Sequence, residues 1–474
     1  MKVTTGLGVR VAAAAVAAAA ILTLPGPAEA KWRKVTSQGQ TGSTSEVGIE
    51  RSANGVLHVL WPSDSGATEQ LMHSAISENG RSIAGPHQVA STTNFINNSV
   101  DLVAGPSGGL RAFFAGVFPG VSNDAIRTST ASASGTTWSG HAAASQTSAG
   151  PTNAAAGSGI GATVTPAGTP WSSWGDSSPG GGGFHAGINP AANDLAFSSG
   201  CCERDPNLAF DSQTGVVAVG WNYLPTGPAA RRLQVVVPFV TGVQDAPMSA
   251  ATWTGQRVGL TGRIGAGGIY AAYGAGTNQF NARPALWRLG AAGAKVLKSP
   301  RDAEHTTVAP APGGRLWLAW EGKDRGFKIF ATRTSPAAKP KGAIVATKPP
   351  KGTQQIYRVN VEGSRGYLDV LALVRRGSGE IAWWHARLRP GLSLRATPQR
   401  VRTGRKVTFK VTDAGQPVAG AKVALKLANK HTKKTNGAGK TTIKVPKSTK
   451  PRRYRARATK GGYAAAKRKV KVVK

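Results

Sequence analysis

The stretch Gly313-Gly314-Arg315-Leu316-Trp317-Leu318-Ala319-Trp320 contains the unit from which most of this 474-residue chain is built. Its glycines predict a tight turn, because glycine takes positive φ values without steric cost. An apolar run follows and ends on a large aromatic residue. The same glycine-to-aromatic step of six residues recurs along the chain at Gly55–Trp61, Gly168–Trp174, Gly215–Trp221 and Gly267–Tyr273. Gly109 and Gly366 keep the turn and the strand without that aromatic.

The spacing of these seven glycines, 47 to 59 residues, predicts the fold class. Each glycine is preceded by a second short apolar run, for example 207–210 or 306–309, so each unit contains a hairpin. A repeat near 50 residues made of short strands and Gly-rich turns is typical of a β-propeller. We therefore predict an all-β chain with a seven-bladed β-propeller over residues 46–389 and almost no helix there.

The tryptophans of the repeat are predicted to be structural. Bulky aromatic side chains fill the space between neighbouring blades, and burial of such rings contributes strongly to a core. We therefore assign Trp61, Trp174, Trp221 and Trp320 to the core between blades rather than to ligand contacts.

The first thirty residues have the pattern of a secretory signal peptide. Lys2 and Arg10 precede an Ala-rich apolar run over 11–24, and Ala28-Glu29-Ala30 gives an A-x-A cleavage site. The apolar run is too short for a transmembrane helix. We expect a secreted protein, extracellular or associated with the cell wall, without membrane insertion after cleavage. Residues 31–45 are expected to form an arm leading into the first blade.

Positive charge is concentrated at the end of the chain. Residues 391–474 hold 25 of the 59 Lys and Arg residues and a single acid, Asp413, which makes this stretch +24 of the total +37. A field of one sign on one segment favours anionic partners.

A turn in the second repeat carries a family resemblance. In Ser134-Gly135-Thr136-Thr137-Trp138, Gly135 and Trp138 match the Asp-box turn of the sialidase-like propellers, whereas Ala131 and Ala133 stand where its Ser and Asp belong. The chain therefore resembles the sialidase-like (bacterial neuraminidase repeat) superfamily over roughly residues 45–388. The arginine motif with which that family grips a carboxylate is missing, so no catalytic residue is carried over, and fold alone does not imply activity.

Polar residues just before the inner strands form the candidate ligand site on the propeller rim. The adjacent Cys201 and Cys202 could form a strained vicinal disulfide or remain two thiols, and both alternatives stay open. The predicted ligand-binding residues of the rim are Cys201, Cys202, Glu203, Arg204, Asp205, Arg263, Glu304, His305 and Arg358. The competing interpretation is a solvated rim that only closes strand ends. No cofactor and no metal ion is predicted.

The chain changes character after Pro390-Gly391, where the last domain (390–474) begins. The stretch GQPVAGAKVALKL with the later turns TNGAGK and KGGY resembles bacterial Ig-like and carboxypeptidase-regulatory-like modules, which implies a small Ig-like β-sandwich. Since side chains alternate along a strand, its cations are predicted on the outer face. The predicted polyanion-binding residues are Lys422, Lys426, Arg453, Arg455, Arg457, Lys467, Lys469 and Lys471.

These observations predict a secreted, non-catalytic binding protein, expected to be monomeric. Its propeller rim would recognise a glycan or protein ligand, and its basic tail would hold an anionic cell-wall or matrix polymer. Nucleic acid is a possible partner but is not favoured, because the tail has no aromatic interleaving adequate for base stacking. The alternative is a diverged sialidase-like glycoside hydrolase or other glycan-processing enzyme, with Glu203/Asp205 and Asp302/Glu304 as its carboxylates. A scaffold for a protein partner is a third interpretation.

Overall fold

The computed structural model shows a protein built from strands. It describes residues 31–36, 46–64, 69–92, 96–105, 107–116, 125–143, 159–175, 184–188, 195–196, 203–223, 231–238, 240–249, 256–277, 281–298, 302–323 and 326–474. No α-helix occurs in these ranges. Nor does any described segment form a helix long and apolar enough to cross a membrane. The signal-peptide prediction for residues 1–30 lies outside these ranges.

Seven four-stranded antiparallel sheets follow one another through the described part of residues 33–388. The first is β2 (Gly48–Arg51), β3 (Leu57–Asp64), β4 (Glu69–Ile76) and β5 (Ile83–Thr92). The second is β6 (Ile96–Ala104), β7 (Leu110–Gly116), β8 (Ala125–Ala131) and β9 (Ala142–Ala143). The third is β10 (Ile160–Val164), β11 (Pro170–Gly175), β12 (Phe184–Ile188) and β13 (Leu195–Ala196).

The remaining sheets repeat this order. The fourth is β14 (Glu203–Asp211), β15 (Val216–Tyr223), β16 (Arg232–Val236) and β17 (Gln244–Asp245). The fifth is β18 (Gly259–Thr261), β19 (Tyr270–Ala275), β20 (Arg283–Arg288) and β21 (Lys295–Val296). The sixth is β22 (Glu304–Ala311), β23 (Arg315–Gly322), β24 (Lys328–Arg333) and β25 (Val345–Thr347). The seventh contains β26 (Thr353–Glu362), β27 (Leu368–Arg376) and β28 (Ile381–Leu388).

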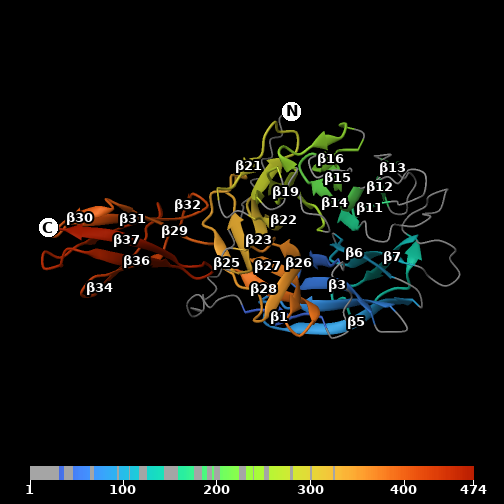
Figure 1. The fold of residues 1–474 in the computed structure, drawn as a ribbon, viewed down its shortest axis with the longest axis horizontal. Coiled ribbons are helices and arrows are strands. Elements are labelled where there is room, and N and C mark those ends of the chain that lie inside the picture. The colour runs from blue at the N-terminus through green and yellow to red at the C-terminus, as the bar shows by residue number, and fades with distance from the viewer. Residues whose placement is uncertain are drawn as a thin grey trace, which may run out of the picture.

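The fourth strand of the seventh sheet comes from the start of the chain. β1 (Arg33–Lys34) pairs with the edge of β28, with Arg33 opposite His385 and Lys34 opposite Trp384. The sheets thus follow one another round a ring that the two ends of the domain close (Figure 1). This arrangement is a β-propeller, and the predicted all-β propeller class is confirmed. The expected arm over 31–45 is corrected at its beginning, because residues 33–34 belong to a sheet.

The repeat aromatics fill the space between neighbouring sheets, as predicted. Trp61, Trp221 and Trp320 are fully buried, and Trp174 is 2% exposed. Trp61 on β3 packs in one cluster with Leu371 of β27, and Trp320 on β23 packs with Tyr270 of β19. Each ring therefore joins its own sheet to the preceding one.

The inner strands approach one another so closely that glycine is required. A Cβ on Gly161 of β10 would lie 2.6 Å from the Cα atom of Asn207 on β14. A Cβ on Gly48 of β2 would lie 2.8 Å from backbone atoms of β6. Neither glycine has a positive φ, so sterics between strands, and not turn geometry, determine these positions.

The last domain is a two-sheet sandwich. One sheet holds β29 (Ser393–Thr397), β31 (Lys406–Asp413), β32 (Gln416–Pro417) and β35 (Lys440–Lys444). The other holds β30 (Arg400–Arg402), β37 (Ala466–Val473), β36 (Arg453–Thr459), β33 (Lys422–Lys426) and β34 (Lys430–Lys434). A core of buried residues such as Phe409, Leu425 and Val470 lies between them.

The sandwich is attached beside the sixth sheet of the propeller and extends away from it (Figure 1). Gly391 forms an isolated bridge with Ala343, next to β25. The Asp413 carboxylate contacts Arg315, with 3.2 Å between Oδ2 and Nη1, and also contacts Arg333. The only acid of residues 391–474 is thus 3% exposed and faces the propeller.

Candidate functional site

A cavity of about 430 Å³ lies on the propeller axis, lined by the inner strands β2, β6, β10, β14, β18, β22 and β26. We call the end where these strands begin the rim end, and the end where they turn into the second strands the hairpin end. The lining includes Phe210, Ile264 and Ser364, which follow or end the inner strands. The cavity therefore extends towards the hairpin end.

At the rim end, the segment before β18 reaches across the axis. Arg257 Nη1 lies 2.7 Å from Asp101 Oδ1, and its Nη2 donates to the Val100 carbonyl. Gln256 forms two hydrogen bonds with the backbone of Val359 in the seventh sheet, of 2.8 and 2.9 Å. The segment before β18 is thus bound to the second and seventh sheets, and Arg257 lines the cavity at this end.

The charges of this closure balance one another. Glu46 Oε1 lies 2.7 Å from Arg358 Nη1, and Glu46 Oε2 lies 3.9 Å from Arg257. Two acids, Glu46 and Asp101, therefore meet two arginines, and all four are less than 9% exposed. Burial raises the pKa of Asp101, and the neighbouring Arg257 opposes this shift. Buried charges need such partners, so the loss of any one of the four would leave an uncompensated charge inside the ring.

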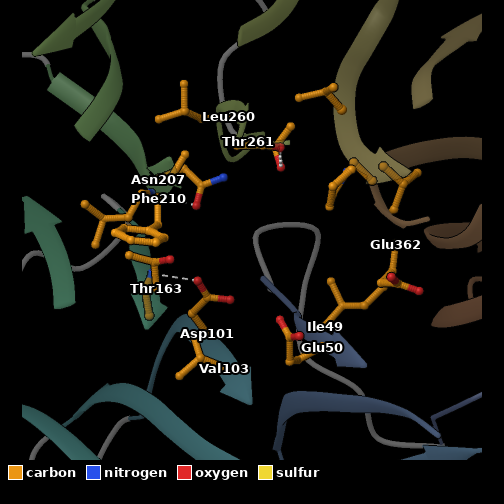
Figure 2. Close-up of a pocket in the computed structure, with 18 of the residues that line it drawn as sticks. Ile49, Glu50, Asp101, Val103, Thr163, Asn207, Phe210, Leu260, Thr261 and Glu362 are labelled. Atoms are coloured by element: carbon orange, nitrogen blue, oxygen red, sulfur yellow. Dashed lines mark hydrogen bonds between the residues drawn. The ribbon is translucent and has the colours of Figure 1, made fainter. Parts of the chain in front are cut away.

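Carboxylates line the other part of the cavity (Figure 2). Glu50 and Glu362 come from β2 and β26, the inner strands of the first and seventh sheets. Burial, with the negative charge of Glu362 next, raises the pKa of Glu50 to about 8. This shift favours the protonated form of Glu50 at neutral pH, while Glu362 is paired with Arg51, with 2.5 Å between Oε2 and Nε.

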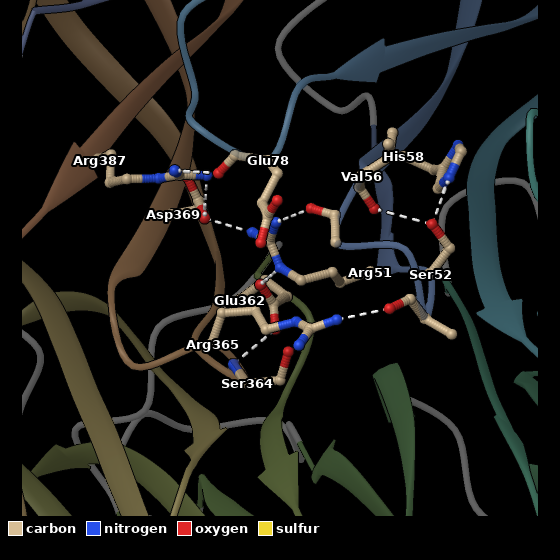
Figure 3. Close-up of polar contacts among 12 residues, drawn as sticks. Arg51, Ser52, Val56, His58, Glu78, Glu362, Ser364, Arg365, Asp369 and Arg387 are labelled. Atoms are coloured by element: carbon tan, nitrogen blue, oxygen red, sulfur yellow. Dashed lines mark hydrogen bonds and ion pairs between the residues drawn. The ribbon is translucent and has the colours of Figure 1, made fainter. Parts of the chain in front are cut away.

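The pair Arg51–Glu362 belongs to a network that joins the first and seventh sheets (Figure 3). Arg51 also contacts Asp369, which accepts hydrogen bonds from Arg387 Nε at 2.8 Å and pairs with His385 Nε2 at 2.7 Å. Burial alone would raise the pKa of Asp369, but His385 and Arg387 lower it below the ordinary value. This network reinforces the seam at which the ring closes.

The structure distributes the predicted rim residues over different environments. Cys201 and Cys202 lie outside the described residues, and for Glu203 and Arg204 only the backbone at the start of β14 is described. Asp205 is buried and accepts a hydrogen bond from Asn222 at 3.4 Å. Arg358, predicted to contact a ligand at the rim, is instead buried against Glu46 inside the ring.

Arg263 was predicted to lie at the rim, and this prediction is wrong. It follows β18 and donates to the carbonyls of Gly314 and Gly267, at 2.8 and 3.0 Å, beside the hairpin turns. The prediction failed because Arg263 lies only four residues before Gly267, at the opposite end of the inner strand.

Glu304 and His305 do lie together at the rim end. His305 Nδ1 is 2.7 Å from Glu321 Oε2, and Glu304 Oε1 is 2.8 Å from the Lys323 ammonium. A bulge between Glu304 and Thr307 interrupts the pairing with β23, and His305 has a φ of 45°. Sequence reasoning missed Glu321, because it sits inside the apolar strand β23 and shares no motif with the rim.

The sandwich presents a cationic face on its five-stranded sheet, and the predicted alternation is confirmed. Arg453, Arg455 and Arg457 are exposed on β36, while the residues between them are buried. In the register with β37, these three arginines stand opposite Lys471, Lys469 and Lys467. Lys422 and Lys426 continue the exposed face on β33, with Lys426 opposite Arg455.

Like charges directly opposite each other destabilise a sheet, so this face is held together by its apolar core and not by its surface. Within residues 391–474, which the structure describes throughout, Asp413 is the only acid and it is bound to the propeller. A hollow of about 520 Å³ on this face is lined by Gln399, Arg400, Arg453, Lys467, Arg468, Lys469 and Lys471.

The class that the fold defines is the β-propeller, here with a basic sandwich attached. No family model and no curated protein matches the chain. Its structure is similar to the GH93 α-L-arabinofuranosidase of Fusarium graminearum, at 9% identity and a TM-score of 0.44, over 76% of this chain and 97% of that one.

Two further solved structures are similar to this chain at comparably low sequence identity. The β-propeller domain of the Trilobed protease from Pyrococcus furiosus has 9% identity and a TM-score of 0.38, over 72% of this chain and 95% of that one. The GH43 endo-arabinanase from Bacillus licheniformis has 12% identity and a TM-score of 0.31, over 66% and 99%. Likenesses this distant carry no argument about activity.

Proposed function

We propose that this is a secreted binding protein in which a seven-bladed, sialidase-type propeller is held to an anionic polymer by a basic Ig-like module. The seven four-stranded sheets support the blade count, and the two-sheet sandwich supports the Ig-like assignment. The observation that carries the function is the face of paired cations on β33, β36 and β37, without an acid to neutralise it. We further propose that the protein is extracellular or associated with the cell wall.

The geometry of this face favours an extended polymer. Cations two residues apart on a strand are separated by about 6.6–6.8 Å, and neighbouring strands by about 4.7–4.9 Å. A polymer with regularly spaced phosphate, sulfate or carboxylate groups could contact several cations at once and release its counterions. Phosphate-bearing wall polymers and acidic glycans fit this chemistry. Nucleic acid is not favoured, because the exposed positions of β33, β36 and β37 hold no aromatic ring for base stacking.

The test uses the full-length chain on immobilised heparin and polyphosphate. The variant Arg453→Gln/Arg455→Gln/Arg457→Gln should elute at clearly lower salt and give a shallower dependence of affinity on salt. The control Lys295→Gln/Lys298→Gln/Lys351→Gln removes the same charge from exposed propeller positions and should leave elution nearly unchanged. Equal losses in both variants would show that retention follows net charge alone, and the proposal would fail.

The second candidate function is glycan processing in the axial cavity. Glu50, whose pKa is raised by burial and by the neighbouring Glu362, resembles the general acid of the carboxylate pairs that glycosidases require. These residues replace Glu203/Asp205 and Asp302/Glu304 as the suppliers of such a pair, since Glu304 is bound to Lys323. Turnover of any glycoside in a fluorogenic panel, abolished by Glu50→Gln, would establish this function. A panel without turnover would leave ligand binding as the role of the propeller.

A further inference from the structure

The rim end of the sixth sheet holds three side chains that could bind a metal ion, Glu304, His305 and Glu321. The proposed polymer binding does not use them. Glu304 and Glu321 stand directly opposite each other in the register of β22 and β23, and both are at most 5% exposed. Two buried carboxyl groups in facing positions repel each other unless positive charge lies between them. Lys323 supplies one such charge, on Glu304 alone.

The bulge adds an imidazole to this pair. In a regular strand, adjacent residues such as Glu304 and His305 would point to opposite faces. The bulge and the left-handed backbone of His305 instead bring both towards Glu321, and bulges often re-aim side chains in this way. One potential ligand atom from each of Glu304, His305 and Glu321 lies within 4.8 Å of the other two.

A separate observation concerns the second carboxylate oxygen of Glu321. Glu321 Oε1 is buried and has no hydrogen-bond partner, while Oε2 of the same carboxylate is paired with His305. A buried carboxylate oxygen normally has a hydrogen-bond donor or a metal ion beside it. In this cluster, His305 already pairs with Oε2 of Glu321, and Lys323 donates to Oε1 of Glu304.

We propose that Glu304, His305 and Glu321 bind a divalent transition-metal ion of the zinc class. One imidazole nitrogen with two carboxylates suits Zn²⁺ at about 2.0–2.2 Å, whereas Mg²⁺ and Ca²⁺ prefer oxygen ligands only. The ion takes the place of the proton between His305 and Glu321, and solvent completes its shell. Lys323 is 49% exposed, so its side chain can move away as the ion enters. The ion then fixes the bulged start of β22 to β23.

The experiment is a titration of the tag-free, full-length protein with ZnCl₂ and with CoCl₂ after chelator treatment and dialysis. We expect saturable binding of one ion per chain by calorimetry, with visible absorption bands for Co²⁺. His305→Ala and Glu321→Gln should weaken the affinity at least tenfold. Lys323→Met should tighten it severalfold, because a competing cation is removed at a half-exposed position where the fold tolerates change.

Two matched controls separate this site from other histidines. His385→Ala removes another buried His–carboxylate pair, at 2.7 Å from Asp369, whose carboxylate already has two arginine partners. His73→Ala breaks a pair of imidazoles whose nitrogens, on His58 and His73, are 3.0 Å apart. Both variants should bind the ion as the original protein does. Binding that is lost with His73, that survives His305→Ala, or that never saturates would overturn the proposal.

Discussion

Single residues in this protein decide both its charge balance and its pH response. Glu50 is the clearest case, because it lines the axial cavity and its pKa is raised to about 8 from an ordinary value near 4.5. An acid whose pKa is higher in the folded state stabilises the fold below its unfolded pKa, and this contribution disappears as the pH rises through the folded pKa. The stability contributed by Glu50 should therefore fall between about pH 4.5 and pH 8.

Glu50→Gln should remove this dependence. We expect the variant to match the original protein near pH 4.5 and to exceed it by up to about 4 kcal/mol near pH 8, because the pKa rises from 4.5 to about 8 and each pKa unit corresponds to about 1.4 kcal/mol. The measurement is urea unfolding at several pH values, with Glu78→Gln as a control at an exposed carboxylate. A difference between Glu50→Gln and the original protein that stays constant with pH would contradict the expectation.

Asp369 should be the most sensitive carboxylate of the closing seam. It is 1% exposed and meets Arg51, His385 and Arg387, so Asp369→Asn leaves buried positive charge without its partner. Removing one member of a buried ion pair costs about 3–5 kcal/mol of unfolding free energy. Glu380→Gln breaks the more exposed pairs with Lys34 and Arg376 and should cost less than about 1 kcal/mol. Chemical denaturation of both variants tests this ranking, and similar losses would refute it.

At the scale of elements, the sequence predicted the features that recur in every repeat, and it did not predict features that occur only once in the chain. The turn glycines and the aromatics at a fixed distance identified the hairpins and the core between sheets, because each signal recurs with the period of the fold. β1 was missed because two residues, Arg33 and Lys34, carry no periodicity. The contacts of Gln256 and Arg257 across the axis carry no such signal, because their partners lie more than 100 positions away in the chain.

β1 should matter more than its length suggests. It covers the edge of β28, and Val35 beside it is buried against Leu371 and Trp383 in the core of the seam. Val35→Asp should detach this strand, because a buried unpaired charge is costly, and should expose a sheet edge that can pair with other chains. We expect a lower unfolding temperature and light scattering that increases with protein concentration. Lys31→Gln, at an exposed position, is the control; a Val35→Asp protein as stable and monodisperse as this control would contradict the role of β1.

At the scale of the whole molecule, charge distinguishes the two domains, because residues 391–474 carry +24 of the total +37. The prediction of a basic tail succeeded because strand alternation and net charge are local properties of the sequence. The structure places only some of the predicted rim residues at the rim end, since which polar residues become buried partners depends on how seven sheets converge. Arg358 and Arg263 both carry a guanidinium group. Arg358 lies inside the ring against Glu46, whereas Arg263 lies beside the hairpin turns.

Asp413 should determine how rigidly the basic sandwich is held by the propeller. Its carboxylate binds Arg315 and Arg333 at the hairpin end of the sixth sheet, where both arginines are largely shielded from solvent. Asp413→Asn removes the ionic contact and leaves two neighbouring arginines to repel each other. We expect the two domains to unfold in separate thermal transitions, and small-angle scattering to report a broader distribution of sizes. Asp245→Asn makes the same charge change at an exposed pair with Arg232 and should alter neither property.

Because the cationic face lies on β33, β36 and β37, away from Asp413, retention of Asp413→Asn on polyphosphate should remain at the level of the original protein. Single-transition unfolding of Asp413→Asn with unchanged scattering would show that other contacts, such as the bridge between Ala343 and Gly391, suffice to hold the domains together.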